Sequence, residues 1–245
     1  MLFRSDYMTA ASRGGFAGDY RAIAQTVEFE HTLTQNFQYA LGITGFNHRM
    51  KGVEGLDDLT NTSLKGLSGE FRYVLVGRGP GSPVGVTLQV EPEWGRVSGT
   101  SGKRESALEV ESTLIVDTEL IPNRLYAAVN LLYEPEVSRG SGESKWERES
   151  TFGVTGGLTY RVTPAIALGG GAQYYRAHSD GFWFDKLQGQ ALFAGPTLHV
   201  RLTKKIFMSA AFSAQVRGHA AGEVHALDLA NFSRYMARLQ FGVEF

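Results

Sequence analysis

Hydrophobic and polar residues alternate with a period of two along most of this chain. The clearest run is the last one, in which apolar or aromatic residues take every second position: Tyr235, Ala237, Leu239, Phe241, Val243 and Phe245. Successive side chains of a β-strand point to opposite faces, so this run predicts a strand with one apolar face and one polar face. At the edge of a soluble sheet it would expose an apolar ribbon with unpaired backbone groups, whereas a transmembrane barrel places the apolar face against lipid.

The same alternation predicts eleven strands long enough to cross a bilayer at a tilt. They cover residues 19–33, 37–48, 66–77, 84–97, 106–119, 124–137, 150–162, 165–178, 188–202, 205–218 and 232–245. Short turns alternate with longer polar loops, the loops falling at about 49–65, 98–105, 138–149, 179–187 and 219–231. This pattern is typical of an all-β, closed antiparallel transmembrane barrel. A soluble sandwich or lipocalin-like barrel is the alternative, but its interior would be apolar, and here the interior face is the charged one.

The direction of the strands predicts one more strand at the front. If the chain ends on the periplasmic side, segment 19–33 descends and needs an ascending strand before it, which gives an even total of about twelve. Residues 1–12 could supply only its outer half, through Phe3, Ser5 and Tyr7.

This count divides the chain into two parts. Residues 1–18 hold a partial first strand and an extracellular loop, and residues 19–245 form the single barrel domain. No signal peptide is visible after Met1, so we expect a signal peptide and part of the first strand to lie upstream of it.

Composition narrows the possible functions. The 245 residues include no cysteine, which excludes a disulfide scaffold or a thiolate metal site. The net charge of −1 gives no electrostatic basis for binding nucleic acid. The chain has no apolar run of the length, about eighteen residues, that a transmembrane helix needs. Glycine is frequent, at 30 residues, which suits a curved barrel wall.

Aromatic residues are expected at both membrane interfaces. Those near the short turns are Phe37, Tyr39, Tyr160, Phe207 and Phe245. Those toward the long loops are Trp94, Tyr133 and Tyr174, with Tyr20 and the cluster Phe182-Trp183-Phe184 beyond them.

The charges predicted to face the lumen separate along the chain. Acidic candidates come from the first half, among them Glu70, Glu91, Glu93, Glu109, Glu111 and Glu134. Basic candidates come from the second half, with Arg72 as the exception: Arg161, Arg201, Arg217, Arg234 and Arg238, with His199 beside them. An acidic wall would then face a basic wall across the lumen, as in a channel whose transverse field orients charged or dipolar solutes. The alternative is a narrow structural barrel filled by cross-lumen ion pairs, and a barrel of about twelve strands does not decide between them.

A barrel enzyme that hydrolyses lipids is a further alternative. Nucleophilic catalysis needs a serine and a histidine within hydrogen-bond reach, two positions apart if they lie on one strand. None of the six histidines has a serine two positions away: His31, His48, His178, His199, His219 and His225. A cross-strand pair remains open. We predict no cofactor and no metal site, because Asp57-Asp58 lacks the ligand spacing of a calcium loop and Gly77–Gly81 lacks the lysine of a phosphate loop.

The terminal strand resembles the C-terminal strand of bacterial outer-membrane β-barrels, whose last aromatic residue is recognised by the barrel assembly machinery. The resemblance implies outer-membrane lipid and this machinery as partners, with Phe245, Phe241 and Tyr235 as the assembly signal. A twelve-strand autotransporter translocator shares these features, but Arg13-Gly14-Gly15 disfavours the helix that it would thread through the lumen.

A second resemblance concerns the region from Gly55-Leu56-Asp57-Asp58-Leu59 to Gly69-Glu70-Phe71-Arg72-Tyr73, together with Val90-Glu91-Pro92. It is similar to a putative outer-membrane transporter family labelled for the MetA pathway of phenol degradation. This implies uptake or export of small organic compounds. The sequence therefore predicts a porin-like outer-membrane channel or transporter for small solutes.

Overall fold

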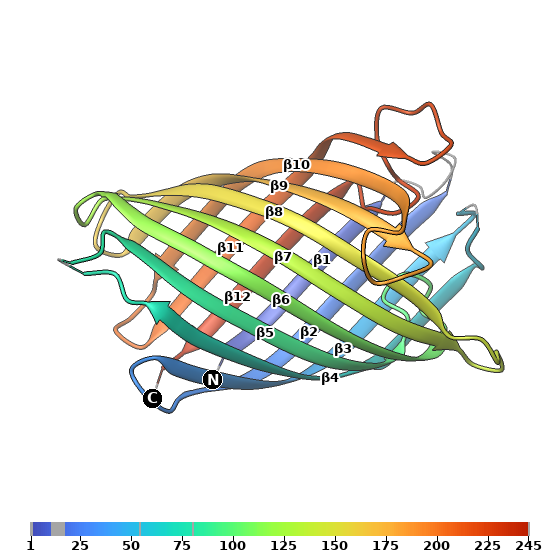
Figure 1. The fold of residues 1–245 in the computed structure, drawn as a ribbon, viewed down its shortest axis with the longest axis horizontal. Helices are drawn as coiled ribbons and strands as arrows, with labels where there is room; N and C mark the ends of the chain where they lie inside the picture. Colours follow the sequence, from blue (N-terminus) through green and yellow to red (C-terminus); the bar gives the residue numbers. More distant parts are fainter. Residues whose placement is uncertain (1, 11–17, 54, 80, 245) are drawn as a thin grey trace.

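The chain forms a closed antiparallel barrel of twelve strands in the computed structural model, which describes residues 2–10, 18–53, 55–79 and 81–244 (Figure 1). The strands are β1 (Leu2–Ala10), β2 (Asp19–Thr32), β3 (Phe37–Lys51), β4 (Leu59–Val76), β5 (Val84–Val97), β6 (Arg104–Ile121), β7 (Leu125–Gly140), β8 (Glu147–Arg161), β9 (Ile166–Ser179), β10 (Lys186–Arg201), β11 (Ile206–Ala220) and β12 (Tyr235–Val243). Each strand pairs with its neighbours in the sequence, and β1 closes the barrel against β12. The predicted fold class is confirmed.

β1 supplies the predicted twelfth strand. It pairs with β2 from Tyr20 to Glu28 and with β12 from Tyr235 to Gly242. Phe29–Thr32 of β2 lie beyond this pairing.

The barrel has two different ends, which we call the turn end and the loop end. The turn end carries the connections 33–36, 77–83, 122–124, 162–165 and 202–205, and the loop end carries 52–58, 98–103, 141–146, 180–185 and 221–234. The two chain termini lie toward the turn end (Figure 1). Strict alternation of length, predicted from the sequence, does not hold, because turn 77–83 is as long as loop 52–58.

Most strands run further at the loop end than the sequence predicts. β4 begins at Leu59 rather than at residue 66, because polar residues continue the ladder with β3. There Asn47 Nδ2 donates a hydrogen bond of 2.8 Å to Thr62 Oγ1 across the two strands. The apolar alternation marks only the part of a strand that needs a lipid-facing surface, so it misses a polar extension of this kind.

The outward face of the barrel is apolar and uncovered. Leu41, Leu67 and Leu168 expose 57%, 51% and 51% of their surface, and large apolar residues lie on this face of β2 to β12. Such a surface would be costly in water but suits acyl chains. No helix among the described residues is long and apolar enough to cross a membrane.

Two of the register shifts between neighbouring strands change the face that a charged residue takes. Between β3 and β4 the bulge inserts Lys65, whose ammonium group reaches an inward-facing glutamate, Glu93. Between β10 and β11 the pairing changes from Phe193 opposite Gln215 to Leu192 opposite Arg217. Because Leu192 is exposed on the outward face, Arg217 lies on that face too. The prediction that Arg217 faces the lumen is wrong, since the bulge reverses the alternation.

Candidate functional site

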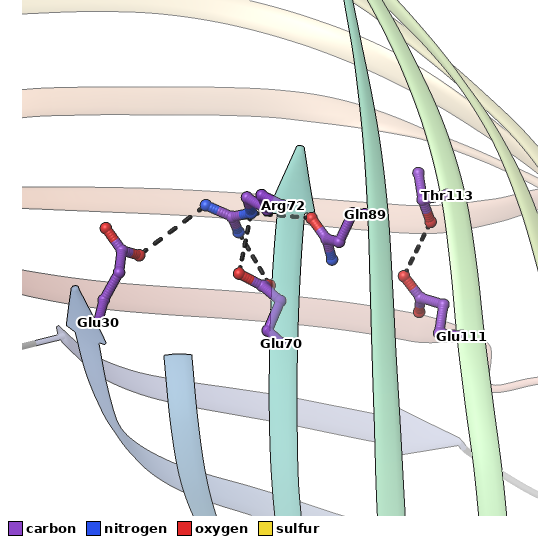
Figure 2. Close-up of polar contacts among 6 residues, drawn as sticks. All are labelled: Glu30, Glu70, Arg72, Gln89, Glu111 and Thr113. Atoms are coloured by element: carbon purple, nitrogen blue, oxygen red, sulfur yellow. Dashed lines mark hydrogen bonds and ion pairs between the residues drawn. The ribbon is translucent and has the colours of Figure 1, made fainter. Parts of the chain in front are cut away.

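An ion-pair network centred on Arg72 lies inside the barrel toward the turn end (Figure 2). The Arg72 guanidinium contacts both Glu70 carboxylate oxygens at 2.9 Å and donates a 3.0 Å hydrogen bond to Gln89 Oε1. Glu30 Oε2 lies 3.8 Å from it, on β2. The network therefore joins side chains from β2, β4 and β5. Arg72 and Glu30 still expose 37% and 35% of their side chains, so water reaches this part of the lumen.

A carboxylate cluster occupies the inward faces of β5, β6 and β7. Glu93 is opposite Glu109, and Glu109 is opposite Glu136 on the next strand. Lys65 forms an ion pair with Glu93 and also interacts electrostatically with Glu109 and Glu134. Glu91 lies opposite Glu111, which accepts a 3.0 Å hydrogen bond from the Thr113 hydroxyl (Figure 2). One lysine therefore faces several carboxylates, and this wall of the lumen is strongly acidic.

The wall formed by β10, β11 and β12 has a different character. His199 Nδ1 and Ser209 Oγ lie 2.9 Å apart, in hydrogen-bond contact on facing positions of β10 and β11. They line a cavity of about 250 Å³, to which β12 contributes Arg238 and Gln240. This wall offers hydrogen-bond donors and positive charge to the lumen.

The two walls lie across the barrel from each other. In the ring of twelve strands, β12 is six strands away from β6. Tyr175 on β9 interacts electrostatically with Arg238 on one side and with Glu111 and Glu134 on the other. The predicted candidates of opposite charge are thus brought to one lumen.

The other predicted basic residues lie outside the cavity that His199 and Ser209 line. Arg161 stands over the Tyr126 ring, with its guanidinium carbon 5.3 Å from the ring centre, toward the turn end. Arg201 ends β10 at the same end. Arg234 precedes β12, which begins three residues later than predicted. The Arg234 guanidinium lies over the Tyr235 ring, and the Arg234 carbonyl accepts a hydrogen bond of 2.9 Å from the backbone amide of Gln215.

Loop 98–103 folds into the lumen at the loop end. The Tyr20 hydroxyl donates a hydrogen bond of 3.0 Å to the Thr100 carbonyl, and His48 Nε2 lies 3.0 Å from the Gly99 carbonyl. Both side chains are fully buried. The sequence predicts Tyr20 in an aromatic girdle at the membrane interface, but Tyr20 faces inward and holds this loop.

Loop 221–234 folds inward from the opposite side. The Gln215 side chain bonds the Asp228 amide and carbonyl at 2.6 Å and 3.0 Å, and Asn231 donates to the Asp228 carboxylate at 3.0 Å. Phe232 stacks on Tyr175 with the ring centres 6.4 Å apart. Burial raises the pKa of the Asp228 carboxyl, against the hydrogen bonds from Asn231 that lower it. Together the two loops narrow the lumen at the loop end.

Several residues of the site were not among the candidates chosen from the sequence. The sequence pattern predicts a loop at Lys65, because the alternation there begins only after the bulge. Tyr175 and Phe232 contact each other from a strand and a loop 57 positions apart, a separation at which sequence pattern gives no signal. The alternation along the sequence indicates only that Tyr175 faces inward.

Among the described residues, two serine–histidine pairs occur across neighbouring strands. Ser150 and His178 are directly opposite on the outward faces of β8 and β9, beneath Phe184. Neither Ser150 Oγ nor His178 Nδ1 has a hydrogen-bond partner among the described residues, so this pair lacks the contact that would activate a nucleophile. His199 and Ser209 do form that contact, in the lumen.

In the part of the chain that the structure describes, no group of three His, Asp or Glu residues is arranged to hold a metal ion. Tyr235 and Phe241 of the predicted assembly signal lie on the outward face of β12, where Tyr235 stacks on Phe212. Phe245 lies outside the described residues.

The closed barrel with an apolar exterior and a polar interior defines a transmembrane β-barrel protein. Within that class, the chain belongs to a family of unknown function, DUF6662, whose family model matches residues 7–245. A search of curated proteins gives no match.

Solved structures of outer-membrane barrels share the fold. The COG4313 outer membrane channel from Pseudomonas putida F1 has a TM-score of 0.60 at 13% identity, over 100% of this chain and 94% of that one. The NanC porin has a TM-score of 0.57 at 9% identity, over 100% of both chains. The translocator domain of the autotransporter NalP from Neisseria meningitidis has a TM-score of 0.54 at 14% identity, over 100% and 86%. At these identities the likeness concerns the fold.

Proposed function

We propose that this protein is a porin-like channel of the bacterial outer membrane, through which small solutes pass by passive diffusion. The loop end would face the exterior and the turn end the periplasm. The apolar outward face supports the membrane location, and the polar interior supports the passage of hydrated solutes. Two similar folds belong to proteins described as an outer membrane channel and a porin.

The observation that carries the proposal is the solvent access of the inward charges. Arg72 and Glu30 form an ion pair and yet keep more than a third of their side-chain surface exposed. In a barrel filled by ion pairs such a network would be buried, because charges removed from water must be fully paired. A water-filled space therefore extends into the lumen from the turn end.

The excess of carboxylates makes the lumen negatively charged and so predicts the ion selectivity of the channel. The inward faces of β5, β6 and β7 carry Glu91, Glu93, Glu109, Glu111 and Glu134, and Lys65 is the basic residue among them. A low-dielectric wall around such a cluster concentrates cations and repels anions. Arg238 and His199 on the opposite wall add a transverse field that orients dipolar solutes.

The test is conductance of the full-length protein in planar lipid bilayers. Changing Arg201 and Arg238 together to Glu makes both walls acidic, so cation preference should increase over that of the natural protein. The matched control changes Lys204 and Lys205 to Gln, in the turn after β10, and should leave the preference nearly unchanged. Selectivity that is the same in the Arg201→Glu/Arg238→Glu variant as in the natural protein would reject the lumen assignment.

A structural barrel without passage is the second candidate, favoured by the two loops that fold inward. If the loops close the lumen, the natural protein shows no single-channel current, and a variant with residues 99–102 deleted conducts. If the lumen is open, both conduct, and the deletion raises the conductance.

Two finer assignments belong to this proposal. Assembly by the barrel assembly machinery would use the C-terminal strand, with Tyr235, Phe241 and Phe245 as its signal. A solute class of small organic compounds rests on the resemblance to the phenol-degradation family, and competition of such compounds with ion current would test it.

A further inference from the structure

A groove lined by arginine lies on the outside of the barrel at the loop end. It has a volume of about 450 Å³ and is lined by Arg96, Arg104 and Arg139, which come from β5, β6 and β7. Ser106, Glu105 and Glu143 also line it. Arg148 and Arg176 extend the positive charge along the outward faces of β8 and β9, where Arg176 is opposite Phe152.

Aromatic rings hold several of these guanidinium groups. The guanidinium carbon of Arg139 lies 4.6 Å from the centre of the Trp146 ring, and that of Arg96 lies 5.8 Å from the centre of the Trp94 ring. Arg148 stands 5.5 Å from the Phe182 ring centre in the same way. These contacts orient the arginines along the outer wall but do not neutralise their charge.

Two carboxylates, Glu105 and Glu143, line the groove beside its three arginines, but neither forms an ion pair with them. Within the described chain, no carboxylate oxygen lies within 4.0 Å of the Arg96, Arg104, Arg139, Arg148 or Arg176 guanidinium groups. Arg176 Nε is buried and lacks a hydrogen-bond partner there. Glu105 lines the groove but interacts electrostatically with the carboxylate cluster of the lumen and with Lys65. The groove therefore keeps a net positive charge for an external anion.

The groove lies at the level of the lipid headgroups, and this position indicates which kind of anion it meets. Trp94, Trp146 and Trp183 expose 46%, 44% and 74% of their surface around it, and tryptophan with this exposure marks the level of lipid headgroups. Trp183 also stacks on Tyr133 of the outer wall. Long arginine side chains reach from the apolar wall to the same level, and the guanidinium fork matches two phosphate oxygens at once.

We propose that this outer groove binds the phosphate groups of a phosphorylated glycolipid in the membrane leaflet at the loop end. Arg96, Arg104 and Arg139 would hold one phosphate, while Arg148 and Arg176 would receive a second headgroup or a second phosphate of the same lipid. The proposal rests on the membrane placement of the barrel and not on solute passage through it.

The three tryptophans of the chain provide the assay. Trp94 and Trp146 lie against groove arginines and Trp183 lies on the same outer wall, so intrinsic tryptophan fluorescence reports on this outer surface. The folded full-length protein in neutral detergent is titrated with bisphosphorylated lipid A and with the same lipid after enzymatic removal of its phosphates. We expect a saturable fluorescence change with the phosphorylated lipid only.

Variants then locate the binding site. In Arg96→Gln/Arg139→Gln the lipid A affinity should fall by about tenfold or more, since two charge-assisted contacts are lost. Lys204→Gln/Lys205→Gln, which removes the same charge at the turn end, should change it by less than about twofold. Heat-modifiable gel migration verifies that both variants are folded. Conductance of Arg96→Gln/Arg139→Gln should match the natural protein, which separates this test from that of the channel.

Three results would overturn the proposal. One is equal affinity for the phosphorylated and dephosphorylated lipids, and another is unchanged affinity in Arg96→Gln/Arg139→Gln. The third is displacement of lipid A by inorganic pyrophosphate at concentrations equal to those of the lipid, which would indicate a site for free anions.

Discussion

Arginines inside the barrel and arginines on its outer wall have opposite surroundings. Arg72 in the lumen contacts Glu70, Glu30 and Gln89, and Arg78 at the turn end lies 2.5 Å from the Asp117 carboxylate. On the outer wall, Arg96 and Arg139 lie over tryptophan rings, with no carboxylate of the described chain within ion-pair distance.

The difference shows where each group finds its counter-charge. Arg72 and Arg78 face carboxylates of the barrel itself, so the protein supplies their partners. An outward arginine at the loop end faces the lipid headgroups, so the membrane supplies its partner. Strands β5 to β7 thus carry carboxylates on their inward faces and arginines on their outer side at the loop end, and each face favours a different class of ligand.

The largest expected effect comes from the acidic lumen. Changing Lys65 to Met leaves the surrounding carboxylates without their ammonium group, and we expect a loss of up to about 3 kcal/mol in the free energy of unfolding. Urea unfolding in micelles, followed by gel migration, measures it. Lys65→Arg keeps the charge and should retain most of the stability. A Lys65→Met barrel as stable as the natural one would show that the cluster is fully hydrated.

A smaller effect is expected at the outer wall. Trp183→Ala removes the stack on Tyr133, whose ring centre lies 5.4 Å away, and should cost about 1 kcal/mol. The same unfolding assay applies, with the exposed Val224→Ala as the matched control. If Trp183→Ala lowers the free energy of unfolding no more than this control, the contact of loop 180–185 with Tyr133 does not stabilise the outer wall.

The Arg72 network should affect selectivity more than stability. Because its groups are partly exposed, Arg72→Gln should cost less than about 1 kcal/mol. Removing a lumen positive charge should nevertheless raise cation preference, measured as a shift of the reversal potential in a salt gradient. Arg124→Gln, at the turn after β6, is the control. A reversal potential that shifts toward anion preference in Arg72→Gln would contradict the placement of Arg72 in the conducting lumen.

The smallest effects concern the pH response of two loops. The pKa of Asp228 is raised by burial, so its ionised form carries a penalty that appears as pH rises through this pKa. Loop 221–234 should therefore dock more firmly as pH falls through this raised pKa. The pKa of Asp57 is lowered by its hydrogen bond to Lys103, so that contact is lost only when pH falls through the lowered pKa, below the pH at which Asp228 takes up its proton. Amide hydrogen exchange, corrected for intrinsic rates, should show increased protection only in loop 221–234, and Asp228→Asn should abolish it. Decreased protection there would contradict the burial argument.

The sequence predicts the barrel well because lipid-facing strands must alternate. The bounds of β5, Val84–Val97, agree to the residue with the predicted segment. Alternation fails at the bulges, where one extra residue brings Lys65 into the lumen and turns Arg217 outward.

The loops show a second limit. Tyr20 and Thr100 are 80 positions apart, and only the closed barrel brings their contact about. The outer groove likewise depends on strand register, because Arg96, Arg104 and Arg139 come from three strands that the sequence does not align. Local pattern therefore predicts which face a side chain takes, while long-range pairing decides what it meets there.

The most direct test of the central claim is the reversal potential of the natural protein in a planar bilayer with a potassium chloride gradient. A water-filled lumen with an acidic wall predicts single-channel currents with a reversal potential that favours potassium over chloride. Absence of current, or a reversal potential that favours chloride, would contradict the account.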